Sequence, residues 1–135
     1  MDIQHDERLI SFQLGGMMFE YDSEKNKKNI EKHGISFESA ARVFFDYDRI
    51  EMYDEGNSIE EDRFQTIGDL SAGEVIIGLQ DTDIVIGNIG NLVNGGDDVI
   101  FVVYTERKKS LKEVTRIISA RYATNFERGL YYGKY

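Results

Sequence analysis

Few side chains in this chain are suited to acid–base chemistry on a phosphodiester. With no cysteine and only two histidines, the sequence excludes thiol catalysis, disulfides and thiolate zinc sites, and we expect neither a metal site nor a cofactor. Cleavage of RNA by attack of a 2′-hydroxyl on its own phosphate needs a proton acceptor, a proton donor and positive charge against the forming phosphorane. The candidates are His33 or Tyr104 for proton transfer and Arg63, Arg116 or Arg121 for charge. Arginine suits the last role because its planar guanidinium can hold two phosphate oxygens at once.

Strand alternation limits which of these arginines can share a site. In a regular strand Arg116 and Arg121 would point to opposite faces, so both can serve one site only if the strand is bulged or ends between them. Arg121 lies at the predicted strand end beside a predicted helix start at Thr124, where an anion also meets free backbone amides. We therefore favour Arg121 as a phosphate contact. The alternative is a surface residue that pairs with Glu106 or Glu127.

A predicted antiparallel hairpin must position Tyr104 and Arg121. Residues 99–103 are five consecutive β-branched or aromatic residues, which predict a central buried strand. Residues 106–110 interrupt the apolar pattern, and residues 114–121 resume a β-rich run. The two runs are therefore expected to pair, with the charged segment as their connection.

Two helices are predicted before this hairpin. After a short strand over residues 19–21, Asp22 or Ser23 can cap a helix that runs through Lys32 and is ended by Gly34. His33 can bond the terminal carbonyls of that helix or take part in chemistry, and the sequence leaves both roles open. A second helix is predicted over residues 36–45, because its apolar residues recur at helical spacing.

The remaining segments complete a predicted α+β fold. Residues 50–53 and 63–68 are strand candidates, and the acidic run between them is expected to be a solvated loop because its spacing does not fit a calcium site. Thr124 and Glu127 form a capping box that begins a short helix over residues 125–132.

The chain is predicted to form a single domain over residues 1–135. Residues 1–18 are weakly patterned and are interpreted as an N-terminal extension. Residues 69–98 contain six of the 13 glycines and two β-rich runs, which predict an inserted hairpin over residues 75–89. No apolar run approaches the roughly 18 residues of a membrane span, and the start of the chain lacks the features of a signal peptide, so a cytoplasmic protein is expected.

The net charge of −9 does not exclude a nucleic-acid partner, because the charge is unevenly distributed. Residues 44–98 carry 14 acids and two bases, whereas residues 99–135 carry three acids and eight bases. Screening over about 8 to 10 Å lets a basic patch act beside an acidic one. The alternative is that these bases only keep a hairpin tip and a helix in solution.

Four segments, in this order, resemble the BrnT family of bacterial type II toxins: FEYDSEKNKKNIEKHGISFESAARVFF (residues 19–45), EEDRFQTIG (60–68), VVYTER (102–107) and RIISARYAT (116–124). The resemblance implies a RelE-like fold, with two N-terminal helices packed on an antiparallel sheet and a short C-terminal helix. It also implies a ribonuclease that cleaves RNA without metal and is held inactive by a cognate BrnA-like antitoxin, a DNA-binding protein. The chain is compatible with a monomer or a homodimer.

The same segments imply site residues. These are Lys32 and His33 in KHG, Arg63 in EDRF, Tyr104 and Arg107 in YTER, and Arg121 in SAR. On this resemblance Arg121 would clamp the phosphate with Arg63 as its partner, and His33 or Tyr104 would be acid or base. Lys32 and Arg107 would bind the RNA backbone.

Three departures from the family pattern support an alternative function. Tyr21 stands where the family commonly has Trp, residues 69–98 are longer than the usual turn, and the tail is less basic. The alternative is a non-catalytic RNA- or protein-binding domain derived from such a toxin.

Overall fold

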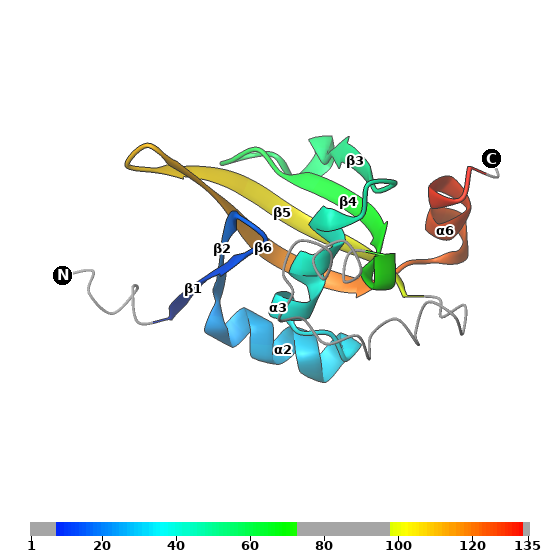
Figure 1. Ribbon diagram of the computed structural model, residues 1–135, viewed down its shortest axis with the longest axis horizontal. Coiled ribbons are helices and arrows are strands. Elements are labelled where there is room, and N and C mark those ends of the chain that lie inside the picture. The colour runs from blue at the N-terminus through cyan, green and yellow to red at the C-terminus, as the bar shows by residue number, and fades with distance from the viewer. Residues whose placement is uncertain (1–7, 73–97, 134–135) are drawn as a thin grey trace.

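The computed structural model of this protein describes residues 8–72 and 98–133, which form a mixed α+β fold (Figure 1). Its elements in chain order are β1 (Leu9–Leu14), β2 (Met17–Asp22), α2 (Ser23–His33), α3 (Phe37–Ala40), the 3₁₀ helix η1 (Ala41–Phe45), β3 (Ile50–Tyr53), the 3₁₀ helix η2 (Glu55–Asn57), β4 (Phe64–Asp69), β5 (Val99–Lys109), β6 (Lys112–Tyr122) and α6 (Asn125–Tyr131). The predicted α+β class is confirmed. Among the described residues, no helix combines the length and the apolar character needed to cross a membrane.

The sheet has six strands in the order β1-β2-β6-β5-β4-β3. Neighbouring strands are antiparallel except β2 and β6, which run parallel. The expectation of a purely antiparallel sheet is therefore wrong at this one pair. The chain leaves β2 through α2 and returns to β6 only after the rest of the sheet, and such a long crossover allows parallel pairing.

The central hairpin is confirmed but is longer than predicted. β5 and β6 each have 11 residues, and the chain turns at Ser110 and Leu111, whose φ angles are 53° and 33°. Residues 106–109, expected to lie in the connection, continue the strand. Their charged side chains alternate between the two faces of a two-stranded ribbon that extends beyond the core. Charged residues can continue the strand there because their side chains need not be buried.

The predicted ends of α2 and α6 are confirmed. The Asp22 carboxylate accepts hydrogen bonds from the backbone N–H groups of Glu24 and Lys25, and Gly34 ends α2 with a φ of 74°, the left-handed conformation that glycine adopts at little cost. The capping box of Thr124 and Glu127 opens α6. The predicted helix over residues 36–45 is instead one α-helical turn followed by η1, whose β-branched and aromatic residues disfavour an α-helix.

Two expectations concern segments at or beyond the described residues. The run interpreted as an N-terminal extension contains β1, which pairs with β2 and packs Phe12 on Phe19 with ring centroids 5.2 Å apart. The predicted inserted hairpin over residues 75–89 lies outside the described residues.

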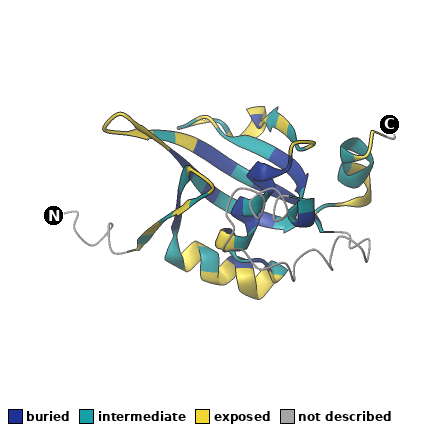
Figure 2. Cartoon of the chain, in the orientation of Figure 1, coloured by how far each residue is buried: buried dark blue, intermediate teal, exposed yellow. Residues whose placement is uncertain are grey.

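The main core lies between the sheet and the N-terminal helices (Figures 1 and 2). α2 is attached by Asn29, which is buried, and whose Nδ2 donates hydrogen bonds to the carbonyl oxygens of Ile35 at 2.9 Å and Ala120 at 2.8 Å. Phe37 and Phe44 are buried in this core, as the helical spacing predicted. We call this side of the sheet the helical face.

The opposite side carries a smaller core at one end. Ile67, Val99 and Phe101 are buried there, and Leu130 and Tyr131 of α6 pack on them. In Figure 1 α6 lies at the far end of the sheet from the β5–β6 turn. Among the described elements, no helix packs on the rest of this side, which we call the open face.

Gly68 is required by close packing between β4 and η1. A Cβ at this position would overlap Cγ2 of Val43 and lie 3.2 Å from Cβ of Arg49. Gly68→Ala is therefore expected to lower the free energy of unfolding by about 1–3 kcal/mol through overpacking. Thermal and urea unfolding measure the loss. The control is Gly56→Ala, where nothing lies within 4 Å of the added atom; equal losses at both glycines would contradict the packing argument.

Candidate active site

The pairing of β5 and β6 decides which predicted residues share a face. Phe101 pairs with Arg121 and Val103 with Ser119, but Tyr104 pairs with Ile117, so Ile118 is an extra residue in β6. This bulge shifts the alternation by one residue. Arg116 therefore lies on the same face as Arg121, which a regular strand would not allow.

Tyr104 lies on the helical face, opposite to Arg121. Only 5% of it is exposed, and its ring lies 4.8 Å from that of Phe44 and 5.7 Å from that of Phe64, centroid to centroid. Burial, with the nearby carboxylates of Glu51 and Glu106, raises the pKa of the Tyr104 hydroxyl above its usual value. Proton transfer by Tyr104 at neutral pH is therefore disfavoured.

The guanidinium of Arg121 forms an ion pair with the carboxylate of Glu127. Its two terminal nitrogens donate to the two oxygens of Glu127 at 2.8 and 2.9 Å, and its guanidinium carbon lies 4.2 Å from the ring centroid of Phe101. The hydrogen bond with Glu127 raises the pKa of Arg121 further, although partial burial opposes it. Pairing with Glu127, the alternative left open by the sequence, is confirmed.

Lys32 and His33 form the last turn of α2. Lys32 is exposed and His33 is half-buried. Since α2 packs on the helical face, neither residue accompanies Arg121 or Arg116. The four predicted catalytic residues His33, Arg63, Tyr104 and Arg121 are thus not gathered on one surface, because the sheet separates them. Their individual roles stay predictions.

Glu61, a residue that the sequence interpretation passed over, contacts Arg107 and lines a pocket together with Arg63. Arg107 Nη2 donates to Glu61 Oε1 at 2.9 Å. Glu61 and Arg63 line a pocket of about 300 Å³. Its other lining residues are Asn57, Ile59 and Glu60. Continuing the alternation of β4 back from Gln65 puts Arg63 on the open face with Arg107.

The loop that carries Glu61 and Arg63 is largely exposed, as expected for a solvated loop, and it is also fixed by its own hydrogen bonds. Ser58 Oγ donates to the carbonyl of Asp54 at 2.7 Å and accepts from the backbone N–H of Arg63 at 2.9 Å. Thr105 Oγ1 of β5 donates to the carbonyl of Asp62 at 2.6 Å. Short polar side chains bonding to nearby backbone explain this order.

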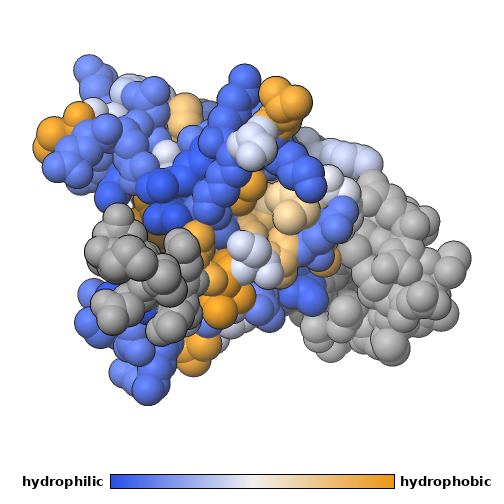
Figure 3. All heavy atoms as spheres, turned by 90° about the vertical axis from the view of Figure 1, so that its left-hand side faces the viewer, coloured by the Kyte–Doolittle hydropathy of each residue, from blue (hydrophilic) through white to orange (hydrophobic). Residues whose placement is uncertain are grey.

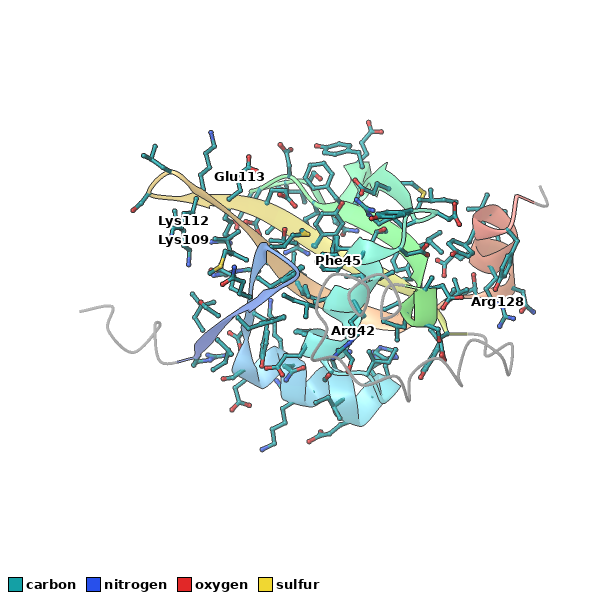
Figure 4. The ribbon with its side chains drawn as sticks, viewed as in Figure 1. Arg42, Phe45, Lys109, Lys112, Glu113 and Arg128 are labelled. Carbon is teal, nitrogen blue, oxygen red and sulfur yellow. The ribbon has the colours of Figure 1, made fainter. Side chains whose placement is uncertain are left out.

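A row of cations follows the open face toward the β5–β6 turn. It consists of Arg63, Arg107, Lys109 and Arg116, which we call the basic strip. Lys109 and Arg116 are joined by Glu20 of β2, whose two oxygens lie 2.5 Å from Lys109 Nζ and 2.7 Å from Arg116 Nε. Figure 4 labels Lys109 near that turn, and the surface seen from this end is mostly hydrophilic, with apolar side chains at its centre (Figure 3).

Arg121 lies apart from this strip. Its partner Phe101 is four residues from Thr105 and six from Arg107 along β5, so roughly 13 and 20 Å of strand separate these positions. The strip and Arg121 therefore form two separate groups of positive charge on the open face.

Comparison with known protein families gives a match that covers part of this region, the loop with Glu61 and Arg63. Residues 21–79 match the sequence model of a family described as the ribonuclease toxin, BrnT, of type II toxin–antitoxin system. The match includes α2, β4 and the loop with Glu61 and Arg63. No curated protein matches the chain. Over residues 21–79 the chain is therefore similar to the BrnT family of ribonuclease toxins of type II toxin–antitoxin systems.

Proposed function

We propose that this chain is an endoribonuclease and the toxin of a type II toxin–antitoxin system. It cleaves RNA by attack of a 2′-hydroxyl on the neighbouring phosphate, without a metal ion. The match of residues 21–79 to the BrnT family model supports the activity. We also infer that α2 and the segment of α3 and η1 are the two N-terminal helices of a RelE-like fold.

The basic strip is the observation that carries the proposal. A chain with a net charge of −9 bears four cations on a face that the described helices leave uncovered, and two carboxylates, Glu20 and Glu61, pair with three of them. Local positive charge of this kind favours a polyanion despite the acidic remainder.

Within the strip, Arg63 and Arg107 are the proposed phosphate contacts. The Arg63 side chain has no hydrogen bond or ion pair with the described residues, and Arg107 uses one terminal nitrogen for Glu61. Lys109 and Arg116 extend the positive surface along the RNA backbone. The proposed partner is a BrnA-like antitoxin that covers this face, and the proposed site of action is the cytoplasm.

The test uses the purified full-length chain and single-stranded RNA in the presence of EDTA. Fragments that end in a 2′,3′-cyclic phosphate are the expected product, together with growth arrest on induced expression that the neighbouring gene product relieves. RNA binding without cleavage, in a folded and harmless protein, would instead support the non-catalytic RNA-binding domain. A folded protein that neither binds nor cleaves RNA overturns the proposal.

A further inference from the structure

We propose that Glu61, which contacts Arg107 and lines a pocket with Arg63, is the general base of the RNA cleavage. This inference rests on the proposed function and names the group that takes the proton of the 2′-hydroxyl. Neither the resemblance nor the family match assigns Glu61 a role.

Glu61 has one oxygen fixed and one available. Oε1 accepts from Arg107 Nη2 at 2.9 Å, whereas Oε2 has no hydrogen bond to the described residues. The side chain is 34% exposed, so an RNA hydroxyl can reach it. A carboxylate that is oriented through one oxygen and open at the other meets the geometric requirement of a general base.

The surroundings of Glu61 hold it in place. Nδ2 of Asn57 lies 3.1 and 3.0 Å from the two oxygens of Asp54, which is buried. Ser58 connects this end of the loop to the backbone of Arg63, and Thr105 fixes Asp62, the residue after Glu61, to β5. A side chain on a loop held at both ends needs little reorganisation before reaction.

Glu20 and Glu127, which also pair with arginine on the open face, are unsuited to this role. Glu20 is 1% exposed and both its oxygens contact cations. Glu127 uses both oxygens for Arg121. Glu61 combines access to solvent with two neighbouring guanidinium groups.

Positive charge next to Glu61 suits the phosphate of the same nucleotide. Arg107 Nε is buried and has no hydrogen-bond partner among the described residues. Glu61 therefore uses only part of the hydrogen-bonding capacity of this guanidinium group. Arg63 lines the same pocket. Both guanidinium groups can stabilise the charge that develops on the phosphorane while Glu61 acts on the adjacent ribose.

In the proposed step the proton of the 2′-hydroxyl moves to Glu61 Oε2, the 2′-oxygen forms a bond to phosphorus, and the bond from phosphorus to the 5′-oxygen breaks. The leaving 5′-oxygen takes a proton from water. The products are a 2′,3′-cyclic phosphate and a 5′-hydroxyl, and the carboxylic acid of Glu61 returns its proton to solvent.

The experiment compares Glu61→Gln with the unmodified chain. Glutamine keeps an acceptor for Arg107 but cannot take a proton at neutral pH. We expect cleavage to fall by about 100-fold or more, while the midpoint of thermal unfolding and the affinity for a 2′-deoxy-substituted RNA stay the same or rise. In the unmodified chain the cleavage rate should fall at low pH, where the general base becomes protonated. In Glu61→Gln this fall should be absent.

The control is Glu55→Gln, which removes the same charge from an exposed position in the same loop and should leave the rate within about twofold. Glu61→Gln that cleaves at the unmodified rate, or that keeps the original pH profile, overturns the assignment while the proposed function stands. An unmodified chain that binds but does not cleave RNA overturns both.

Discussion

Replacing Arg63 by alanine is expected to reduce RNA cleavage about 100- to 1000-fold, the range seen when one group that stabilises an oxyanion is removed. Its side chain has no ion pair with the described residues and contributes to the fold through its backbone, whose carbonyl accepts from Asp54 at 2.8 Å. The midpoint of thermal unfolding should therefore hardly change. Cleavage rates at saturating RNA and unfolding curves are the two measurements.

Arg121→Ala is the informative comparison, since it removes an arginine that the resemblance also indicates. Here we expect a loss of stability of about 1 kcal/mol, because two hydrogen bonds to Glu127 and the contact with Phe101 disappear. If Arg121→Ala abolishes cleavage without loss of stability and Arg63→Ala does not, the phosphate site lies beside α6 instead. Compared with Arg63→Ala, Arg63→Lys should recover more of the affinity for RNA than of the cleavage rate, because an ammonium group cannot hold two phosphate oxygens at once.

Removing the cations around Glu20 is expected to cause the largest loss of stability. Glu20 is 1% exposed, whereas the side chains of Arg116 and Lys109 are 25% and 45% exposed. Lys109→Met combined with Arg116→Met leaves a buried, unpaired carboxylate and should cost about 3–5 kcal/mol. Adding Glu20→Met to this double variant should recover part of the lost stability, because the buried, unpaired carboxylate is then removed. Urea unfolding of the double and triple variants measures both effects, and a triple variant less stable than the double would contradict the argument.

The stability that Glu20 contributes through Lys109 and Arg116 should decrease at low pH. Burial raises the pKa of the Glu20 carboxyl, but hydrogen bonds from Lys109 and Arg116 outweigh burial and hold the pKa below its usual value. A lowered folded-state pKa gives stability that is present above the unfolded pKa of about 4.3 and is lost as the pH falls through the folded value. In Glu20→Gln the decrease in unfolding midpoint over about pH 5 to 3 should be smaller than in the unmodified chain.

Much of the fold could be predicted because local signals coincide with tertiary contacts. The run at residues 99–103 forms the most buried part of β5, and Asp22, Gly34 and Thr124 mark helix ends through their own hydrogen bonds or backbone angles. The resemblance to the BrnT family, inferred from four segments, is confirmed by the family match over residues 21–79, which include most of the first segment and all of the second.

The candidate site could not be predicted in the same way. The bulge at Ile118 lies in a run of residues that all suit a regular strand, so no residue type reveals it, yet it changes the face on which Arg116 lies. Glu61 stood in an acidic run that is typical of a solvated loop. Its proposed role depends on Arg107, 46 residues later, a pairing that only the folded sheet creates.

The extra residue in β6 also bears on how such a protein can diverge. Loss of Ile118 would leave the pairs on either side of it, Val103 with Ser119 and Tyr104 with Ile117, directly consecutive, so Arg116 would keep its side of the sheet and its place beside Glu20. A relative with a regular strand and two arginines four residues apart would thus present the same charges as this bulged strand does with a spacing of five. When such sequences are aligned, one gap in this strand would therefore conserve the charged surface, whereas an alignment without a gap would place one arginine on the wrong side.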